Sequence, residues 1–175
     1  VTFTATVTAS AGSAAPTGTV EFFDGAISLG IDSAANSTGT GTSTWSLSTA
    51  TLTAGAHTSI HAVYTPTGSF AGSTSTNSTQ TVNQKALTGS FTAANKPYDG
   101  STAATVLTRT LTGVLAGDVA TVSLTGGTAT FNTAAAGPGK TVTLAGATLT
   151  GTAAGNYTLT SVGTTTANIM EAWTA

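Results

Sequence analysis

The two histidines are the first residues to test for chemistry, because imidazole is a common metal ligand and a common general base. His57 and His61 are four residues apart, a spacing that places both side chains on one face of a strand or of a helix. A metal site needs further Cys, His or carboxylate ligands, but the chain has no Cys and no acidic residue near this pair in sequence. We therefore predict no metal site. His57 is expected to make a structural hydrogen bond at a corner, and His61 to be an outward polar residue.

The six acidic residues are scattered along the chain. Asp24, Asp32, Asp99 and Asp118 each stand beside Gly, Ser or a turn, where a short carboxylate accepts backbone N–H bonds and holds the loop. Calcium takes about six to eight oxygen ligands, and no Asp-x-Asp-x-Asp spacing is present. A glycosidase needs two carboxyl groups within about 5–10 Å, and a serine nucleophile needs a base with an orienting acid; no pattern selects either. The sequence predicts neither an enzyme nor a cofactor.

The basic residues form no cluster either. Lys85, Lys96, Arg109 and Lys140 are far apart, and the formal net charge is -2. Nucleic acid and anionic lipid surfaces both require clustered Lys and Arg, so neither partner is expected. No run of about 20 apolar residues occurs, so membrane insertion is not expected either. A spontaneous Lys–Asn bond would require a buried lysine beside an Asn and an acid, and none is predicted because charged residues are rarely buried without a partner.

The composition indicates which elements position these residues. Thr supplies roughly a quarter of the 175 residues, whereas charged residues make up only 6%. Thr is β-branched and suits a solvent-facing strand position. Low charge, abundant Thr and the lack of Cys are typical of secreted β-proteins that do not depend on disulfides. We predict that the chain is extracellular or at the cell surface.

Alternation of apolar and polar residues predicts the strands. Residues 1–9 alternate Val, Phe, Ala and Val with Thr, which places the apolar side chains on one face of a half-buried strand. Aromatic-Asp-Gly turns stand at residues 23–25 and 98–100, since Gly accepts positive φ and Asp tolerates it. The same period predicts inward-facing residues in both halves of the chain: Val20, Phe22, Trp45, Leu47, Ile60, Ala62, Tyr64, Val122, Leu124, Ala129, Phe131, Val142, Leu144, Tyr157, Leu159, Ala167 and Ile169.

The strand pattern divides into two parts that meet near Gln84 and Lys85. A unit of about 85 residues buries only about 60–65% of the surface that its unfolded chain exposes, so each core is modest. We predict an all-β fold of two tandem antiparallel β-sandwich domains. The first spans residues 1–84, and the second spans residues 85–175 with a short C-terminal tail.

Four elements of the first part occur in a characteristic order. They are an initial Val-Thr-Phe-Thr strand, the hairpin Gly-Thr-Val-Glu-Phe-Phe-Asp-Gly at residues 18–25, the corner Leu-Thr-Ala-Gly-Ala-His at residues 52–57, and Ala-Val-Tyr at residues 62–64. They resemble the bacterial Ig-like repeats of long surface adhesins, which implies an Ig-like sandwich. Such repeats usually have a strand before Val-Thr-Phe-Thr, so either the chain is cut from a longer one or another copy supplies that strand. The structural motif residues of this part are Phe23, Asp24, Gly25, Gly55, His57 and Tyr64.

The second part carries Tyr-Asp-Gly at residues 98–100, Gly-Asp at 117–118, Gly-Pro-Gly-Lys at 137–140 and Gly-Asn-Tyr-Thr-Leu at 155–159. Over residues 85–169 it resembles the YDG domain of bacterial surface proteins. That resemblance implies tandem repeats in large secreted or surface-attached proteins and no catalytic activity. The structural motif residues of this part are Tyr98, Asp99, Gly100, Gly155, Asn156 and Tyr157.

Aromatic residues are expected to be core anchors, with one exception. Trp45, Tyr64, Tyr98 and Tyr157 occupy inward positions of the alternation, so they are not expected to form a platform for stacking sugars. Trp173 lies beyond the last predicted strand, and we expect it to pack against a following domain or a neighbouring subunit.

These features favour a non-catalytic stalk segment of a bacterial surface or secreted adhesin-like fibre, which extends or presents other domains. Its expected partners are neighbouring repeats or identical subunits. Two alternatives stay open. One is a filament subunit linked to the next by strand donation, because uncovered sheet edges allow it. The other is a carbohydrate-binding or spacer module of a secreted protein, with cell-surface or matrix glycans as partners.

Overall fold

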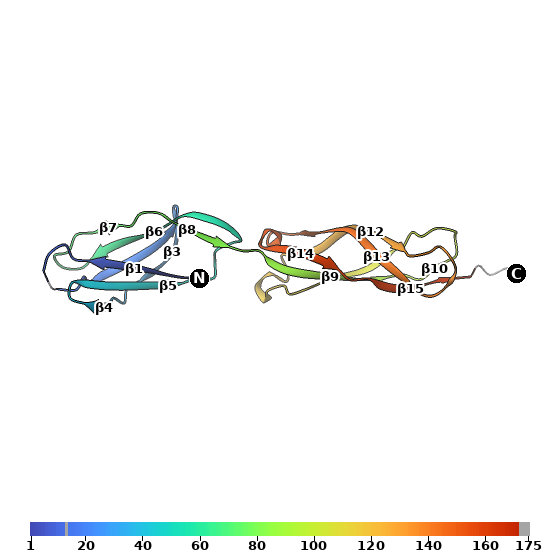
Figure 1. Ribbon diagram of the computed structural model, residues 1–175, viewed down its shortest axis with the longest axis horizontal. Coiled ribbons are helices and arrows are strands. Elements are labelled where there is room, and N and C mark those ends of the chain that lie inside the picture. The colour runs from blue at the N-terminus through green and yellow to red at the C-terminus, as the bar shows by residue number, and fades with distance from the viewer. Residues whose placement is uncertain (13, 172–175) are drawn as a thin grey trace. The chain divides into compact units, whose positions relative to one another are not determined.

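The computed structural model describes residues 1–12 and 14–171, and regular structure within them is almost entirely β-strand. The chain divides into two compact units, unit 1 (Val1–Asn83) and unit 2 (Gln84–Ala175). Each unit contains two β-sheets (Figure 1). The predicted all-β fold of sandwich type is confirmed.

The smaller sheet of unit 1 has three strands in the order β1-β5-β4. Their bounds are β1 (Thr2–Thr8), β5 (Thr42–Ser48) and β4 (Asn36–Gly39). β1 and β5 are antiparallel, with Ala5 opposite Trp45. Exposed and partly buried residues alternate along β1, because successive side chains of a strand point to opposite faces.

The larger sheet of unit 1 has five strands and is organised around β6 (Gly55–Pro66). One edge of β6 pairs with β2 (Gly18–Asp24), and β3 (Ile27–Asp32) lies outside β2. The other edge of β6 pairs with β8 (Ser78–Val82) in its first half and with β7 (Ser73–Thr74) in its second half.

The core of unit 1 contains the predicted inward residues. Val20, Phe22, Trp45 and Tyr64 form one cluster, and each is at most 4% exposed. Burying an apolar side chain of this size contributes about 1.5–3 kcal/mol. The rings of Trp45 and Tyr64 have centroids 5.3 Å apart, so they pack directly on each other.

A bulge interrupts the pairing of β2 with β3. The register shifts at Leu29, which is the extra residue that a β-bulge leaves unpaired. Leu29 packs against the core, whereas Ile27 and Ile31 are 69% and 59% exposed. The edge strand β3 therefore presents apolar side chains to solvent.

Unit 2 also has two sheets. The three-stranded sheet has the order β11 (Val106–Thr112), β9 (Lys85–Ala93), β14 (Tyr157–Val162). The four-stranded sheet has the order β10 (Lys96–Pro97), β15 (Thr165–Met170), β13 (Gly137–Thr150), β12 (Ser123–Phe131). Two short 3-10 helices, η1 (Ala116–Asp118) and η2 (Ala154–Asn156), precede β12 and β14.

Two strand pairs of unit 2 are parallel, β14 with β9 and β10 with β15. The alternation pattern places side chains on the two faces of a strand but says nothing about the direction of its neighbour. Antiparallel pairs account for the other ladders, including the longest, between β12 and β13.

The core of unit 2 confirms most of the predicted inward positions. Phe131, Val142 and Ile169 are at most 3% exposed and form a cluster with Phe91. A second cluster contains Leu87, Val122, Ala153 and Tyr157. Leu159 is only partly buried.

The prediction that Tyr98 is a core anchor is wrong. Its side chain is 48% exposed. β10 ends one residue earlier at Pro97, and the Tyr98 backbone N–H donates to the Met170 carbonyl oxygen at 2.7 Å. The chain then leaves the sheet as a loop, so the alternation that predicted an inward side chain no longer applies.

Candidate functional site

The first Asp-Gly turn joins β2 to β3. Asp24 and Ile27 are the last paired residues, so Gly25 and Ala26 form a two-residue hairpin loop. Gly25 has φ +57°, and glycine adopts that conformation without the steric cost that other residues meet. The Gly25 N–H donates to the Ser59 carbonyl oxygen on β6 at 3.0 Å, which attaches the turn to the neighbouring strand.

The imidazole of His57 holds this turn from the other side. Its Nδ1 lies 2.6 Å from Asp24 Oδ2, and its Nε2 lies 2.9 Å from the Thr53 carbonyl oxygen. Both partners are acceptors, and only the protonated ring has two N–H donors to satisfy them. The bond to the Thr53 carbonyl, followed by the bond to Asp24, raises the pKa of His57 against the opposing effect of burial. Neither ring nitrogen is available as a metal ligand or as a base.

His61 occupies a separate environment. Its Nδ1 lies 3.1 Å from the Ser59 carbonyl oxygen, and its ring stacks on Phe23 with centroids 5.2 Å apart. The sequence predicted its polar role but not the stack, although residues facing each other in neighbouring strands regularly pair in this way. His61 stands directly opposite Phe23 in the β2–β6 ladder.

Tyr64 and Gly55 complete the motif residues of unit 1. The Tyr64 hydroxyl donates to the Thr17 carbonyl oxygen at 2.6 Å, and burial raises the pKa of this hydroxyl. Trp45 Nε1 donates to the adjacent Gly18 carbonyl oxygen at 3.3 Å. Gly55 begins β6 with φ +140° and pairs with Val82 of β8. These residues anchor the start of β2 and the start of β6.

The second Asp-Gly turn is organised by a lysine. Lys96 Nζ donates to Asp99 Oδ1 at 2.7 Å, to the Ser101 carbonyl oxygen at 2.8 Å and to Ser101 Oγ at 2.9 Å. The same nitrogen lies 5.7 Å from the centre of the Phe131 ring. An ammonium group has three donors, so this one is fully used. Lys96 begins the Lys-Pro-Tyr-Asp-Gly turn that the sequence predicts, but its bonds to Asp99 and Ser101 were not predicted.

Asp99 is held in its ionised form by the same contacts. The Lys96 ammonium, followed by the Ser101 backbone N–H and hydroxyl, lowers the pKa of Asp99 to about 2. Gly100 follows with φ +77°, and nothing lies within 4 Å of the position of a Cβ there. Tyr98 and Asp99 are exposed, so this motif forms a surface loop.

Two further motifs of unit 2 meet at Tyr157. Its hydroxyl donates to Asp118 Oδ2 at 2.6 Å and accepts from the Leu115 backbone N–H at 3.2 Å. The bond to Asp118, followed by burial, raises the pKa of Tyr157. Gly155 accepts a bond from the Gln84 side chain through its carbonyl oxygen at 2.9 Å, and Asn156 ends η2. The Gly-Asp and Gly-Asn-Tyr motifs are therefore linked directly, through the hydrogen bond from Tyr157 to Asp118.

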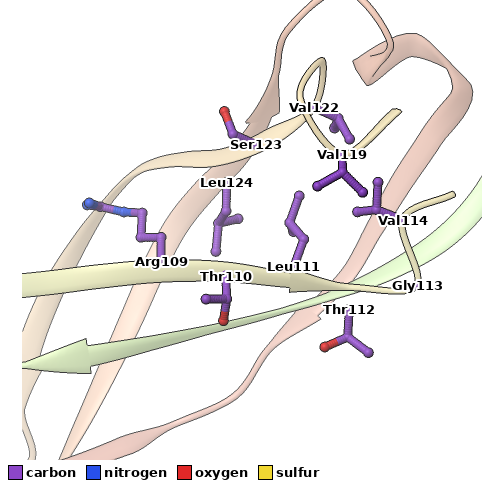
Figure 2. Close-up of a pocket in the computed structure, with 10 residues that line it drawn as sticks. All are labelled: Arg109, Thr110, Leu111, Thr112, Gly113, Val114, Val119, Val122, Ser123 and Leu124. Atoms are coloured by element: carbon purple, nitrogen blue, oxygen red, sulfur yellow. The ribbon is translucent and has the colours of Figure 1, made fainter. Parts of the chain in front are cut away.

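An open groove lies where the two sheets of unit 2 part, between β11 and β12 (Figure 2). We call it the β11–β12 groove. Its volume is about 570 Å³, which falls in the range of about 300–1,000 Å³ typical of ligand sites. Arg109 also lines a second cavity, which has a volume of about 480 Å³. The groove was not predicted from the sequence, because it arises where two edge strands of different sheets are not paired with each other. Its lining residues are Arg109, Thr110, Leu111, Thr112, Gly113, Val114, Val119, Val122, Ser123 and Leu124.

Unit 1 has a smaller opening between its sheets. A cavity of about 110 Å³ lies between β1, β6 and β7, with core residues Val20 and Tyr64 in its lining. We call it the β1–β7 seam. β1 pairs with β5 on one side and with no other described strand.

Among residues 1–12 and 14–171, no group of three or more His, Asp or Glu side chains lies close enough to hold a metal ion. No helix in this part of the chain is long and apolar enough to cross a membrane. Trp173, singled out in the sequence, lies outside the described residues.

Comparison with known protein families gave two matches. Residues 1–83 match the family model described as bacterial Ig-like domain (group 3), and residues 83–167 match the one described as YDG domain. The order and extent of both matches confirm the two predicted resemblances. No curated protein and no solved structure matched the chain.

Proposed function

Because the chain is a bacterial Ig-like domain followed by a YDG domain, we propose that it is a non-catalytic structural segment of a bacterial extracellular or cell-surface protein of the adhesin type. In this role it extends or presents other domains. Bacterial Ig-like domains commonly occur in surface proteins, which supports the location.

The observation that carries the proposal is how the chemically capable side chains are used. Both ring nitrogens of His57 and all three donors of Lys96 are engaged in holding turns. The Tyr157 hydroxyl links η1 to β14. Catalytic groups need a free lone pair or proton directed at a substrate, and these groups direct theirs at the fold. The contacts of His57, Lys96 and Tyr157 therefore stabilise the fold, as expected for a structural domain.

Surface accessibility in the producing bacterium tests the proposal. Intact cells are incubated with a non-permeating protease and then probed with an antibody against this chain. We expect the protein to be digested on intact cells, while a cytoplasmic marker protein survives until the cells are lysed. A chain that is protected until lysis and absent from the medium would contradict the proposed location.

A second candidate function, strand-linked self-assembly, is favoured by the geometry of β1. Val1 and Thr49 form a doubly hydrogen-bonded pair, since the Val1 nitrogen donates to the Thr49 oxygen and the Thr49 N–H donates to the Val1 oxygen. Backbone groups alternate between the two sides of an antiparallel strand. The even-numbered residues of β1, Thr2 to Thr8, therefore direct their N–H and C=O groups to the free edge.

The β1–β7 seam lies beside this free edge, so an added strand would gain backbone bonds to β1 and insert alternate side chains over Val20 and Tyr64. We propose that an extended segment of a neighbouring copy can occupy it. This would make the chain a subunit of a strand-linked assembly.

The substitution Thr6→Pro tests this second candidate. Thr6 lines the seam and directs its N–H outward, so proline removes a bond to the added strand and none to β5. Assembly seen by electron microscopy should be lost in Thr6→Pro. The control is Thr8→Ser, which keeps the edge N–H. Assembly that survives Thr6→Pro would contradict strand addition at β1.

A further inference from the structure

The β11–β12 groove combines an apolar floor with one positive charge. Figure 2 shows Arg109 and Leu111 on one side of β11, toward Val119, Val122 and Leu124, and Thr110 and Thr112 on the other. Val119 is 67% exposed at this opening. β11 pairs with β9, and its other edge has no partner strand among the described residues. The groove is therefore open both to an apolar side chain and to an added strand.

Arg109 has no acidic partner in the described part of the chain. One nitrogen, Nη2, donates to the Gly126 carbonyl oxygen at 3.0 Å. A guanidinium group has five donors, so most of its capacity is available. A carboxylate is the ligand that its fork geometry fits best.

Glu171 is the acidic residue that is left without a partner. It is exposed directly after β15 and makes no hydrogen bond or ion pair with another described residue. The other five acids all accept bonds inside their own unit: Glu21 from Ser28, Asp24 from His57, Asp32 from the Ser46 N–H, Asp99 from Lys96 and Asp118 from Tyr157.

Glu171 and Trp173 are two residues apart in sequence, as are the groove residues Arg109 and Leu111. In an extended chain, residues two apart point to the same side at a separation of about 6.6–7 Å. Arg109 and Leu111 have this relation on β11, and Glu171 and Trp173 would have it in an extended segment parallel to β11. We propose that residues 171–173 of a second copy lie along the free edge of β11. The Glu171 carboxylate contacts the Arg109 guanidinium, and the Trp173 indole fills the groove.

The register of unit 2 requires the segment to come from a second copy. β15 ends beside residue 137 of β13, whereas the groove residue Leu124 stands opposite residue 149 of β13. These two positions are about 40 Å apart along the strand at about 3.3 Å per residue. The three residues that follow Met170 up to position 173 can span at most about 10 Å of extended chain. A copy cannot fill its own groove.

The contact joins two different surfaces, so it is heterologous. Such contacts form rings or open chains and do not stop at a symmetric dimer. In this contact, residues 171–173 of one copy bind the β11–β12 groove of another. The contact requires neither a location at the cell surface nor strand addition at β1.

Sedimentation of the full chain at increasing concentration tests the inference. We expect the weight-average mass to rise beyond that of a dimer. Arg109→Glu and Glu171→Arg should each weaken association at least about tenfold, and the double variant should restore it by reversing the pair. Trp173→Ala should weaken association as well. Lys140→Glu, which changes a cation of β13 outside the groove, should leave it unchanged.

Three results would overturn the inference. One is a chain that stays monomeric up to about 1 mM, the weak end of specific association; Arg109 would then serve only as an inward charge that protects an edge strand. Another is association that persists in Arg109→Glu and Trp173→Ala. The third is a double variant as weak as the single ones. Circular dichroism of each variant verifies that it remains folded, and Thr6→Pro separates this contact from strand addition at β1.

Discussion

The two Asp-Gly turns use the same dipeptide in opposite ways. In unit 1 the Asp24 carboxylate bonds to His57, 33 residues later in the chain. In unit 2 the Asp99 carboxylate bonds to Lys96 and Ser101, which lie within three residues of it. The first turn is fixed by tertiary structure, and the second is fixed by its own sequence.

The difference has a physical consequence for when each turn becomes ordered. The bond between Asp24 and His57 forms only after β6 has paired with β2, because that pairing brings the two residues together. The contacts of Asp99 close a loop of a few residues, which costs little entropy. We infer that the Tyr98-Asp99-Gly100 loop is the more autonomous of the two turns, and that the Asp24 turn reports on the integrity of unit 1.

Removing the lysine that organises the second turn should give the largest effect. Lys96→Met keeps the alkyl stem and removes both bonds to Ser101 and the contact with the Phe131 ring, so unit 2 should lose about 2 kcal/mol of unfolding free energy. Hydrogen exchange read peptide by peptide measures this loss in unit 2. Lys85→Met, at an exposed position of β9, is the matched control and should change little.

The same variant has a second readout in the titration of Asp99. The folded pKa of about 2 lies below the ordinary value of 3.8, so Asp99 contributes stability above about pH 4 that is lost as the pH falls through 2. In Lys96→Met the pKa of Asp99 should rise toward 3.8, as carboxyl NMR shifts would record. An unchanged pKa would show that the Ser101 bonds alone hold the carboxylate.

Both turns contain a glycine in the left-handed conformation. Replacing either glycine should lower the unfolding free energy by a similar amount, and by less than the loss of Lys96. Gly25 and Gly100 have φ +57° and +77°, and open space surrounds the position of a Cβ at each. Gly25→Ala and Gly100→Ala should therefore each cost about 1–2 kcal/mol, from the left-handed conformation alone. Gly25→Asn and Gly100→Asn should cost less, because Asn tolerates this region. Unequal costs in urea unfolding would mean that one turn changes conformation in response.

Structural features that depend on neighbouring residues in the sequence could be predicted, whereas features that depend on two distant segments could not. Side-chain alternation depends on adjacent residues, so the buried positions of Val20, Trp45, Phe131 and Val142 could be predicted. The exposure of Ile27 could not, since a bulge in a strand pair belongs to two segments at once.

The same distinction applies to the candidate site. The structural role of His57 could be predicted from the lack of ligands near it, but its partner Asp24 could not, because the strand order that brings them together is not encoded locally. The β11–β12 groove could not be predicted either. It depends on how two edge strands are spaced, whereas Leu111 and Val122 by themselves indicate only buried positions.

The pH dependence of unit 1 should be opposite in sign to that of Asp99. The folded pKa of His57 lies above the ordinary 6.5, so its contribution to stability is fully present below about pH 6.5 and is lost as the pH rises through the folded pKa. Unit 1 should thus be more stable at pH 6 than at pH 9. Trp45 fluorescence during urea unfolding measures this, since Trp45 is fully buried.

Asp24→Asn and His57→Gln test the source of that dependence. Asp24→Asn keeps the shape of the turn but removes the charge, and should cost about 1 kcal/mol at pH 6 and less at pH 9. In His57→Gln the slope between these two pH values should vanish. A slope that persists in His57→Gln would contradict its assignment to His57.

The smallest effect should come from the most conspicuous aromatic residue of the second turn. Tyr98 is 48% exposed, and its contact with β15 is made by the backbone. Tyr98→Phe should therefore change the unfolding free energy of unit 2 by less than about 0.5 kcal/mol. Tyr157→Phe removes the same hydroxyl at a buried position, where it bonds to Asp118 and to the Leu115 N–H, and should cost clearly more. Thermal unfolding of the two variants side by side compares one chemical change in two environments. An equal loss in both would mean that the Tyr98 hydroxyl has a structural partner after all, and the turn of unit 2 would then depend on tertiary contacts as the turn of unit 1 does.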